Sequence, residues 1–416
     1  MSDALMMSSG LISRGKTGHS LNCYDYPGEN PYAMKPIEFP DFLFSSPLAK
    51  AIIELERIRS DMGDGTTHPA VFSQLKDVFQ LMSNIMSARI EGNRTSIVDA
   101  VAGVERADRY GDVQQNDGVQ EIVQLQEATA FVDATVSPGT MLTHGLVREI
   151  HRISVAGLER EGDRTPGAYR LSDVTISGSA HRPPAPGDVH SDMTSLLDFI
   201  NADVEQNFEL LKIALAHHRF VWIHPFGNGN GRVGRLLTYA AMRRHGFSDA
   251  AGYRGLNPTA VFGQNRSLYY ERLEDADSLE PAALIRWSTY VLEGLLADMR
   301  KLSMLGTQGF VIDELLLPAL RRGLQSARFT ENEARALFIV AEKGEAKASD
   351  LESAFPGSAA TRSQNIRKLL DRGVIEPIGD GRRIYRLRLV PSELTPLLTW
   401  RLDQMGFLPQ ILRDTQ

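Results

Sequence analysis

The chain has 416 residues, of which 42% are apolar and 23% are charged, and its formal net charge at pH 7 is −7. At roughly 100–200 residues per domain, this length predicts two to four domains. Aromatic residues make up 7% of the chain and its mean hydropathy is −0.21, a composition that argues against a disordered chain and against a membrane protein.

The first 46 residues are rich in Pro, Gly, Ser and Asn and are predicted to form an irregular arm. Residues 1–20 lack a basic segment followed by an apolar one, so no secretion signal is predicted and we expect a cytoplasmic protein. The single cysteine, Cys23, excludes an internal disulfide and a Cys-rich zinc module.

Beyond this arm, apolar residues recur every three or four positions, a spacing that predicts amphipathic helices. Leu48, Ile52 and Leu55, for example, would share one helix face. The helices predicted in this way cover residues 47–62, 69–90, 117–136, 141–157, 192–201, 203–223, 231–242, 258–275, 281–303 and 309–325.

Residues 162–188 interrupt this helical pattern. Glycine and proline recur throughout the stretch, and residues 174–176 (Val-Thr-Ile) are its only strand-like run. The pattern predicts a long loop that carries a short hairpin.

From Thr330 the pattern changes again. Thr330 and Glu333 have the spacing of a capping box, which predicts a helix to about residue 343. Helices over 348–355 and 359–372, followed by strands over 374–378 and 383–387, would complete a winged-helix arrangement. Residues 358–390 carry eight basic and three acidic side chains, so this segment is +5 and the rest of the chain is −12. A basic recognition helix favours DNA, but winged helices also bind proteins, and both partners stay open.

Residues 224–235, His-Pro-Phe-Gly-Asn-Gly-Asn-Gly-Arg-Val-Gly-Arg, form the sharpest motif. Closely spaced glycines let a backbone approach a ligand, and the loop leads into a helix whose first N–H groups attract anions. Arg232 and Arg235 are three residues apart, with guanidinium forks that suit phosphate oxygens. His224 ends the preceding helix and can accept a proton near neutral pH. The motif therefore predicts an anion cradle with a base beside it.

Other interpretations of this motif are weaker. Gly229, Gly231 and Gly234 match the dinucleotide fingerprint, with Asp249 near the expected acidic position, but the residues before them have helical periodicity. A Walker A loop would end in Gly-Lys-Ser/Thr, which does not occur here. A glycine-rich connection between helices, with surface arginines and no ligand, is the structural alternative.

The motif resembles the signature of the Fic domain family, His-Pro-Phe-x-x-Gly-Asn-Gly-Arg-x-x-Arg, whose members mostly transfer AMP from ATP to protein hydroxyls. Three further segments resemble the family in the same order along the chain. Residues 87–93 (Ser-Ala-Arg-Ile-Glu-Gly-Asn) resemble its inhibitory motif, residues 169–184 its target-binding flap, and residues 265–270 the helix near the adenine. The resemblance covers about residues 45–300.

The expected fold is all-α, with a mainly helical Fic core, a small β-hairpin flap and a C-terminal winged helix-turn-helix domain. The predicted division is an arm (1–46), a helical segment with the inhibitory motif (47–136), the Fic core (137–305), a linker helix (306–327), the winged helix (328–392) and a tail (393–416).

The resemblance implies a role for each part of the motif. His224 would be the catalytic base that removes the proton from a target Ser, Thr or Tyr hydroxyl. Gly229, Asn230 and Gly231 would bind the α- and β-phosphates of ATP. Phe226 would face the core and anchor the loop.

The resemblance also implies roles for three charged residues. Arg232 would act in catalysis by neutralising the leaving pyrophosphate, and Arg235 would reach the γ-phosphate. In an inhibited state, Glu91 would pair with Arg235 and block productive placement of ATP, because a carboxylate competes with phosphate for the same guanidinium.

Asn228 departs from the family pattern, in which Asp or Glu usually holds Mg²⁺ at this position. An amide oxygen can ligate a hard cation but brings no charge, so the affinity for the metal should fall. Three outcomes stay open: weak AMP transfer, altered nucleotide chemistry, or a degenerate enzyme kept for binding.

The expected function is that of a protein adenylyltransferase with ATP as substrate, Mg²⁺ as an uncertain cofactor, and a protein target bound at the flap. One alternative is a DNA-binding regulator with a nucleotide-sensing or degenerate core. Another is a de-AMPylase, in which Glu91 would position the attacking water. No membrane partner is expected, and a homodimer is compatible with the resemblance. The target is not predicted, because flap recognition uses backbone pairing.

Overall fold

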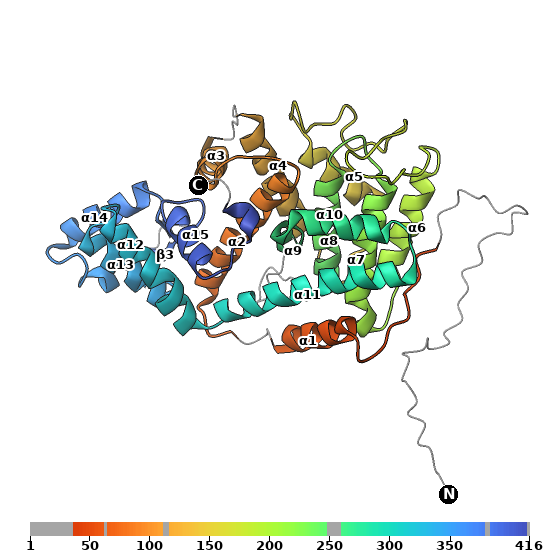
Figure 1. The fold of residues 1–416 in the computed structure, drawn as a ribbon. Coiled ribbons are helices and arrows are strands. Elements are labelled where there is room, and N and C mark those ends of the chain that lie inside the picture. The colour runs from red at the N-terminus through yellow and green to blue at the C-terminus, as the bar shows by residue number, and fades with distance from the viewer. Residues whose placement is uncertain (1–35, 62–64, 111–115, 248–258, 379–382, 414–416) are drawn as a thin grey trace, which may run out of the picture.

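The computed structural model describes residues 36–61, 65–110, 116–247, 259–378 and 383–413, and these residues are mainly helical (Figure 1). Most of the N-terminal arm, including Cys23, lies outside the described residues, as do Asp249 and the predicted wing tip at 379–382. Within the described ranges, no helix is both long and apolar enough to cross a bilayer.

In the described residues up to 305, all the regular elements are helices. They are α1 (Pro47–Asp61), α2 (Pro69–Ile90), α3 (Ile97–Tyr110), α4 (Asp117–Thr135), α5 (His144–Ser154), α6 (Val189–Asn201), α7 (Gln206–Ile223), α8 (Asn230–Arg244), α9 (Thr259–Gln264), α10 (Arg266–Ala276) and α11 (Pro281–Leu305).

The C-terminal part combines helices with a small sheet. Its helices are the π-helix η1 (Phe310–Leu316), α12 (Leu317–Gln325), α13 (Glu331–Lys343), the 3₁₀ turn η2 (Ala348–Leu351), α14 (Ala359–Asp371), α15 (Thr395–Gln404) and the 3₁₀ turn η3 (Gln410–Leu412). Strands β1 (Ala346–Lys347), β2 (Ile375–Pro377) and β3 (Ile384–Leu387) form an antiparallel sheet in the order β1-β3-β2. The helices expected to begin near 331 and 359 and the two expected strands are thus present, together with the unexpected strand β1, whereas the helix expected over 348–355 is only the 3₁₀ turn η2. The winged-helix assignment and the domain boundaries stay predictions.

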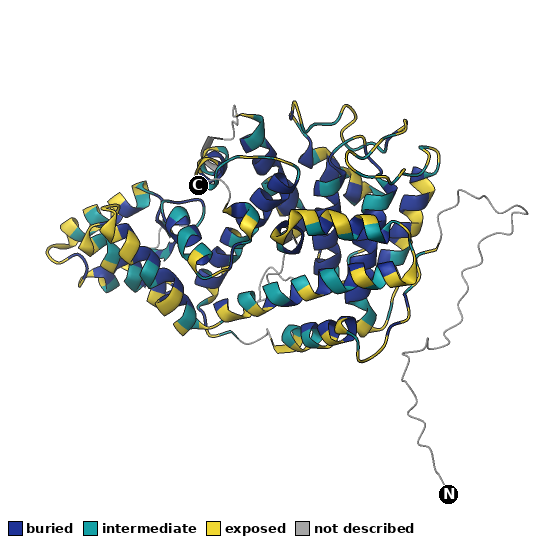
Figure 2. Ribbon diagram, viewed as in Figure 1, coloured by how far each residue is buried: buried dark blue, intermediate teal, exposed yellow. Residues whose placement is uncertain are grey.

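Helices α7 and α8 pack against each other at the centre of the N-terminal part and are buried on most sides (Figure 2). Elements α4, α5, α6 and α11 cover them. Trp287 of α11 is fully buried, and its indole Nε1 donates to the carbonyl of Ala214 at 2.7 Å, so its polar atom is satisfied. The loop between α7 and α8 therefore emerges from a rigid core.

Helix α2 lies between the core and the C-terminal elements (Figure 1). Gln74 accepts the N–H of Leu389 at 2.9 Å, and Arg89 donates Nη1 to the carbonyl of Ile411 at 2.8 Å. Gly92 follows the helix with φ +102°, a conformation that side-chain-bearing residues rarely adopt, so the helix ends at this point. Both parts of the chain thus hold the helix that leads to Glu91.

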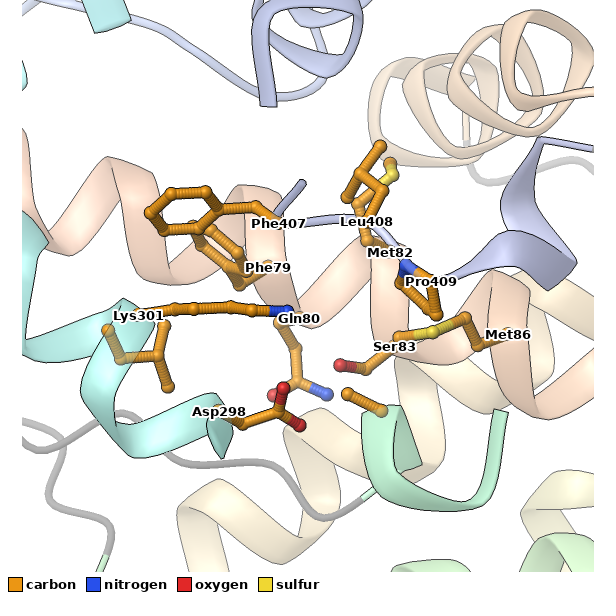
Figure 3. Close-up of a pocket in the computed structure, with 12 residues that line it drawn as sticks. Phe79, Gln80, Met82, Ser83, Met86, Asp298, Lys301, Phe407, Leu408 and Pro409 are labelled. Atoms are coloured by element: carbon orange, nitrogen blue, oxygen red, sulfur yellow. The ribbon is translucent and has the colours of Figure 1, made fainter. Parts of the chain in front are cut away.

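A small cavity of about 40 Å³ lies where α2 and α11 meet residues 407–409 (Figure 3). Its walls are mostly apolar, but Nε2 of Gln80 and Oδ2 of Asp298 are buried there without a hydrogen-bond partner among the described residues. Burial raises the pKa of Asp298 to about 6. The volume is large enough for ordered water beside these polar atoms.

The predicted flap hairpin is wrong. Residues 162–188 contain a tight turn, in which Ser179 donates its N–H to the carbonyl of Ile176 at 3.2 Å, but the structure assigns no strand to this stretch. A strand needs a neighbour to complete its ladder, and no described segment pairs with residues 174–176. The β-branched residues at 174–176 have a high propensity for strands, but they do not form one in the structure.

Other differences concern helix limits. The helix expected over 258–275 is divided at Asn265, whose side chain caps α10 by accepting the N–H of Leu268 at 3.0 Å. The helix expected over 309–325 begins as the π-helix η1, and the one expected over 348–355 is only a 3₁₀ turn. Helices α3 and α15 were not predicted, the latter because it lies in the segment assigned to a tail.

Candidate active site

A cavity of about 650 Å³ opens over the loop between α7 and α8. Its walls come from that loop, from Glu91 after α2, from the flap residues 175–179 and from α10. The structure therefore brings the four segments of the sequence motifs to one place. Every predicted site residue except Phe226, which was assigned to the core, lines this cavity.

The loop is held open by its own side chains. Asn230 accepts the N–H of Phe226 at 2.9 Å and donates Nδ2 to the carbonyl of the same residue, also at 2.9 Å. Its side chain is therefore committed to the loop, and only its backbone N–H, at the start of α8, is suited to an anion. Gly229 has φ +75°, and a Cβ there would come within 2.9 Å of Val155. A Cβ at Gly231 would collide with the carboxylate of Glu91.

His224 ends α7 in the left-handed region (φ 50°, ψ 60°), which turns the chain into the loop at Pro225. Its Nδ1 lies 3.2 Å from the carbonyl of Val221, and because a carbonyl can only accept, Nδ1 carries the proton. Nε2 is then the atom with a free lone pair. Burial, with the positive charge of Arg170 adding to it, lowers the pKa of His224 to about 4. The ring is therefore a neutral base at physiological pH.

The ion pair expected between Glu91 and Arg235 is present, with 2.8 Å between Oε1 and Nη2. Arg235 also donates Nε to Oγ of Ser87 and Nη2 to its carbonyl, both at 2.9 Å. Burial alone would raise the pKa of Glu91, but the charges of Arg235, Arg232 and Arg266 outweigh it and lower the pKa. Nη1 of Arg235 is buried without a hydrogen-bond partner within the described residues, so the guanidinium keeps one free donor group at the loop.

Arg232 differs from the expectation of a guanidinium free for pyrophosphate. It is 0% exposed, its Nη1 lies 3.3 Å from Oε1 of Glu121, and its Nη2 donates to the carbonyl of Glu161 at 2.6 Å. Glu121 in turn accepts Nδ2 of Asn93 at 2.8 Å. Sequence reasoning missed Glu121, which lies 111 positions before Arg232. Nothing in the sequence distinguishes it from the other acidic residues of its helix.

Asn228 is engaged within the loop. Its Oδ1 accepts the N–H of Gly229 at 2.7 Å, and its own N–H donates to Oδ2 of Asp163 at 2.9 Å. In the part of the chain that the structure describes, no group of three or more His, Cys, Asp or Glu side chains could hold a metal ion. One neutral oxygen that is already bonded is a poor donor set for Mg²⁺, which prefers carboxylates. The residues present therefore do not fit Mg²⁺ well.

His151 of α5 supports the loop between α7 and α8, and sequence reasoning missed this residue as well. Its ring stacks on Phe226 with 3.8 Å between centroids, and Nε2 donates to the carbonyl of Asn228 at 3.2 Å. The N–H of Gly167 donates to Nδ1 at 2.9 Å, which fixes a neutral tautomer, and burial lowers the pKa of His151 to about 4. One ring thereby joins the loop at 226–228 to the segment that contains Gly167.

Comparison with known proteins shows which family model and which relatives this part of the chain resembles. Residues 141–242 match the family model described as "Fic/DOC family". The chain is 31% identical over 204 residues to protein adenylyltransferase Fic of Aedes aegypti, covering 48% of this chain and 38% of that protein. With the protein of the same name from Nematostella vectensis it is 33% identical over 169 residues, covering 40% and 36%. The chain thus spans less than two fifths of the length of these relatives.

A solved structure of a Fic family protein from Desulfovibrio desulfuricans G20 has the same fold. It superposes with a TM-score of 0.51 at 19% sequence identity, covering 84% of this chain and 98% of that one. The signature loop, the helices on either side of it and the family match all fall on the same residues. Residues 141–242, which include the signature loop, therefore match the Fic/DOC family model, and the fold of the chain is that of the solved Fic family protein.

Proposed function

We propose that this chain is a protein adenylyltransferase that transfers AMP from ATP to a Ser, Thr or Tyr hydroxyl of a protein target. The observation that carries the proposal is the neutral ring of His224 beside a glycine loop and Arg235 in one cavity. The hydroxyl oxygen would attack the α-phosphorus while its proton passes to Nε2 of His224, and pyrophosphate would leave as the P–O bond breaks.

The same geometry supports self-inhibition by Glu91. Its carboxylate pairs with Nη2 of Arg235 and lies against Gly231, where the phosphates of ATP would bind. Phosphate can accept from Nη2 of this guanidinium only after the carboxylate leaves it. We therefore infer that the structure represents the inhibited state.

Two radioactive forms of ATP test the reaction type. With label in the α-phosphate, protein in a cell lysate should become labelled; with label in the γ-phosphate, it should not. The reverse pattern would indicate a kinase, and no label in either case, with Glu91 replaced as described below, would contradict the proposal.

Asn228→Asp tests the role of a metal. The carboxylate would add charge close to Asp163, so Mg²⁺ should bind more tightly, by about tenfold or more. We expect the Mg²⁺ concentration that gives half the maximal transfer rate to fall accordingly. Asn228→Ser, which adds no charge, is the control. An unchanged requirement for Mg²⁺ in the Asp variant would show that this position does not face the metal. Because the residues present fit Mg²⁺ poorly, no step is assigned to it here.

The alternative functions, DNA binding and removal of AMP, have less support. Three basic side chains of the predicted recognition helix and wing are paired with carboxylates, Arg362 with Glu352, Arg372 with Glu333 and Glu393, and Arg386 with Glu376. These pairs reduce the charge available to DNA. Removal of AMP by a water at Glu91 remains the nearest competing chemistry, and release of AMP from a labelled protein would reveal it. The DNA partner, the homodimer and the cytoplasmic location stay predictions.

A further inference from the structure

Arg170 holds the end of α7 by its guanidinium and by its backbone. The side chain is 4% exposed. Nε donates to the carbonyl of His224 at 2.8 Å, Nη2 to that of Ile223 at 3.4 Å, and the backbone N–H to that of Pro225 at 2.9 Å. The residue thus contacts the three consecutive residues that set the direction of the His224 ring.

The same guanidinium closes the base of the flap. Nη1 donates to the carbonyl of Ser172 at 3.1 Å, and Nη2 donates to that of Pro184 at 2.5 Å. These two residues stand at either end of residues 173–183, the part of the flap that lines the cavity. Both arms of the flap and the segment of His224 therefore meet at one side chain.

No carboxylate in the described ranges forms an ion pair with Arg170, so its partners are backbone carbonyls. A buried charge is a costly way to join loops, since burial also lowers the pKa of Arg170. What the guanidinium provides is geometry, because it has five donors in a fixed plane. Those donors reach both ends of the flap and the residue that carries the base.

We propose that Arg170 is a positioning residue that sets the distance between a target segment on the flap and the ring of His224. The inference rests on the proposed function, in which the hydroxyl of a target held by the flap gives its proton to Nε2. Arg170 then fixes the distance between His224 and a target that docks on residues 173–183, because one rigid group contacts both segments. Displacement of reacting atoms by about 1 Å can lower a rate by about 10²-fold.

The charged groups around His224 give the proposal a second readout. Arg170 and His181 lower the pKa of His224, whereas Glu91 raises it. His181 also ties the flap to α7, since its Nε2 donates to the carbonyl of Trp222 at 2.8 Å, but it does not contact the backbone of His224. It is therefore the matched control for loss of a flap contact alone.

The experiment compares Arg170→Gln, Arg170→Lys and His181→Phe in a Glu91→Gly background. Three quantities are measured: the rate of transfer from α-labelled ATP to lysate protein, the Kd for ATP by calorimetry, and the titration of the His224 ring by NMR. We expect Arg170→Gln to lower the rate by about 10²-fold, to change the Kd by less than about threefold, and to raise the pKa of His224. Arg170→Lys keeps the charge and some of the donors, so it should recover part of the rate without raising that pKa.

The outcomes separate the two claims. An unchanged rate in Arg170→Gln, or a loss no larger than that of His181→Phe, overturns the positioning role. An equal loss of rate and of ATP affinity also overturns it, because it indicates collapse of the whole site. If the Glu91→Gly parent transfers no label, the proposed function fails. The titration of His224 and the hydrogen exchange of the flap in Arg170→Gln then still decide whether Arg170 joins the flap to the segment of His224. If Arg170→Gln does not fold, Arg170→Lys carries the comparison.

Discussion

Glu91→Gly is expected to raise the incorporation of label from α-labelled ATP by about 5–150-fold, the range of a coupling free energy of 1–3 kcal/mol. The carboxylate of Glu91 lies 2.8 Å from Nη2 of Arg235, so it competes directly with phosphate for that guanidinium. Removing it frees the fork and also the space against Gly231. The measurement is label incorporated into lysate protein or into the chain itself.

Stability gives an independent check on the same variant. Arg235 is 1% exposed, and without Glu91 its charge is buried with Ser87 as its one remaining partner among the described residues. The Tm without nucleotide should therefore fall, and the rise in Tm on adding ATP should exceed that of the wild type. Glu91→Gln is the matched control, because it keeps the shape and removes the charge, and it should activate less. Equal labelling by wild type and Glu91→Gly would contradict self-inhibition.

His224→Ala, introduced into Glu91→Gly, is expected to lower the transfer rate by about 10²–10⁴-fold, the usual contribution of a general base. Nε2 is the free atom of the ring because Nδ1 donates to Val221, so no other atom of His224 can take the proton. The phosphate loop does not depend on this side chain, and the Kd for ATP should stay within a few-fold. Transfer at the rate of the parent would refute the assignment of the base.

The pH dependence of the parent variant follows from the environment of His224. Burial lowers its pKa to about 4, so the base stays deprotonated as the pH falls through 6.5, where a solvent-exposed histidine would become protonated. We expect kcat/KM for ATP, which reports the free enzyme, to be level from pH 8 to about 5.5 and to fall only as the pH approaches 4. Because the charge of Glu91 raises this pKa, the fall in rate of this variant, which lacks Glu91, should lie further toward acid than that of the wild type. A fall in kcat/KM near pH 6.5 would show that the His224 ring is more exposed than it is in this structure.

Sequence reasoning reached the site wherever function restricts the residue types locally. The loop at 224–235 followed from a motif whose chemistry demands those side chains, and the pairing of Glu91 with Arg235, across 144 positions, followed from the resemblance to the Fic family. Helices such as α2 followed from their periodicity. These features are properties of short segments or of recognisable pairs of segments.

The parts that were missed depend on tertiary packing. Glu121, Asp163 and His151 reach the loop only because α4 and α5 pack beside α8, and their residue types carry no mark of it. Val174-Thr175-Ile176 has the composition of a strand, but a strand also requires a neighbour, which the described part of the chain does not supply. Propensity is local, whereas a ladder or a buried ion pair is a property of two distant segments.

The hydrogen bond from Arg89 to Ile411 joins residues that are 322 positions apart. A chain leaves the ribosome from its N-terminus, and its parts begin to fold as they emerge. The helices that surround the candidate active site are complete at α11, long before residues 407–412 are made, and until then the side of α2 that carries Phe79 and Met82 has no cover from them. During synthesis, Glu91 therefore follows a helix that is only partly packed, and the pairing with Arg235 reaches its full stability only when the later segment docks.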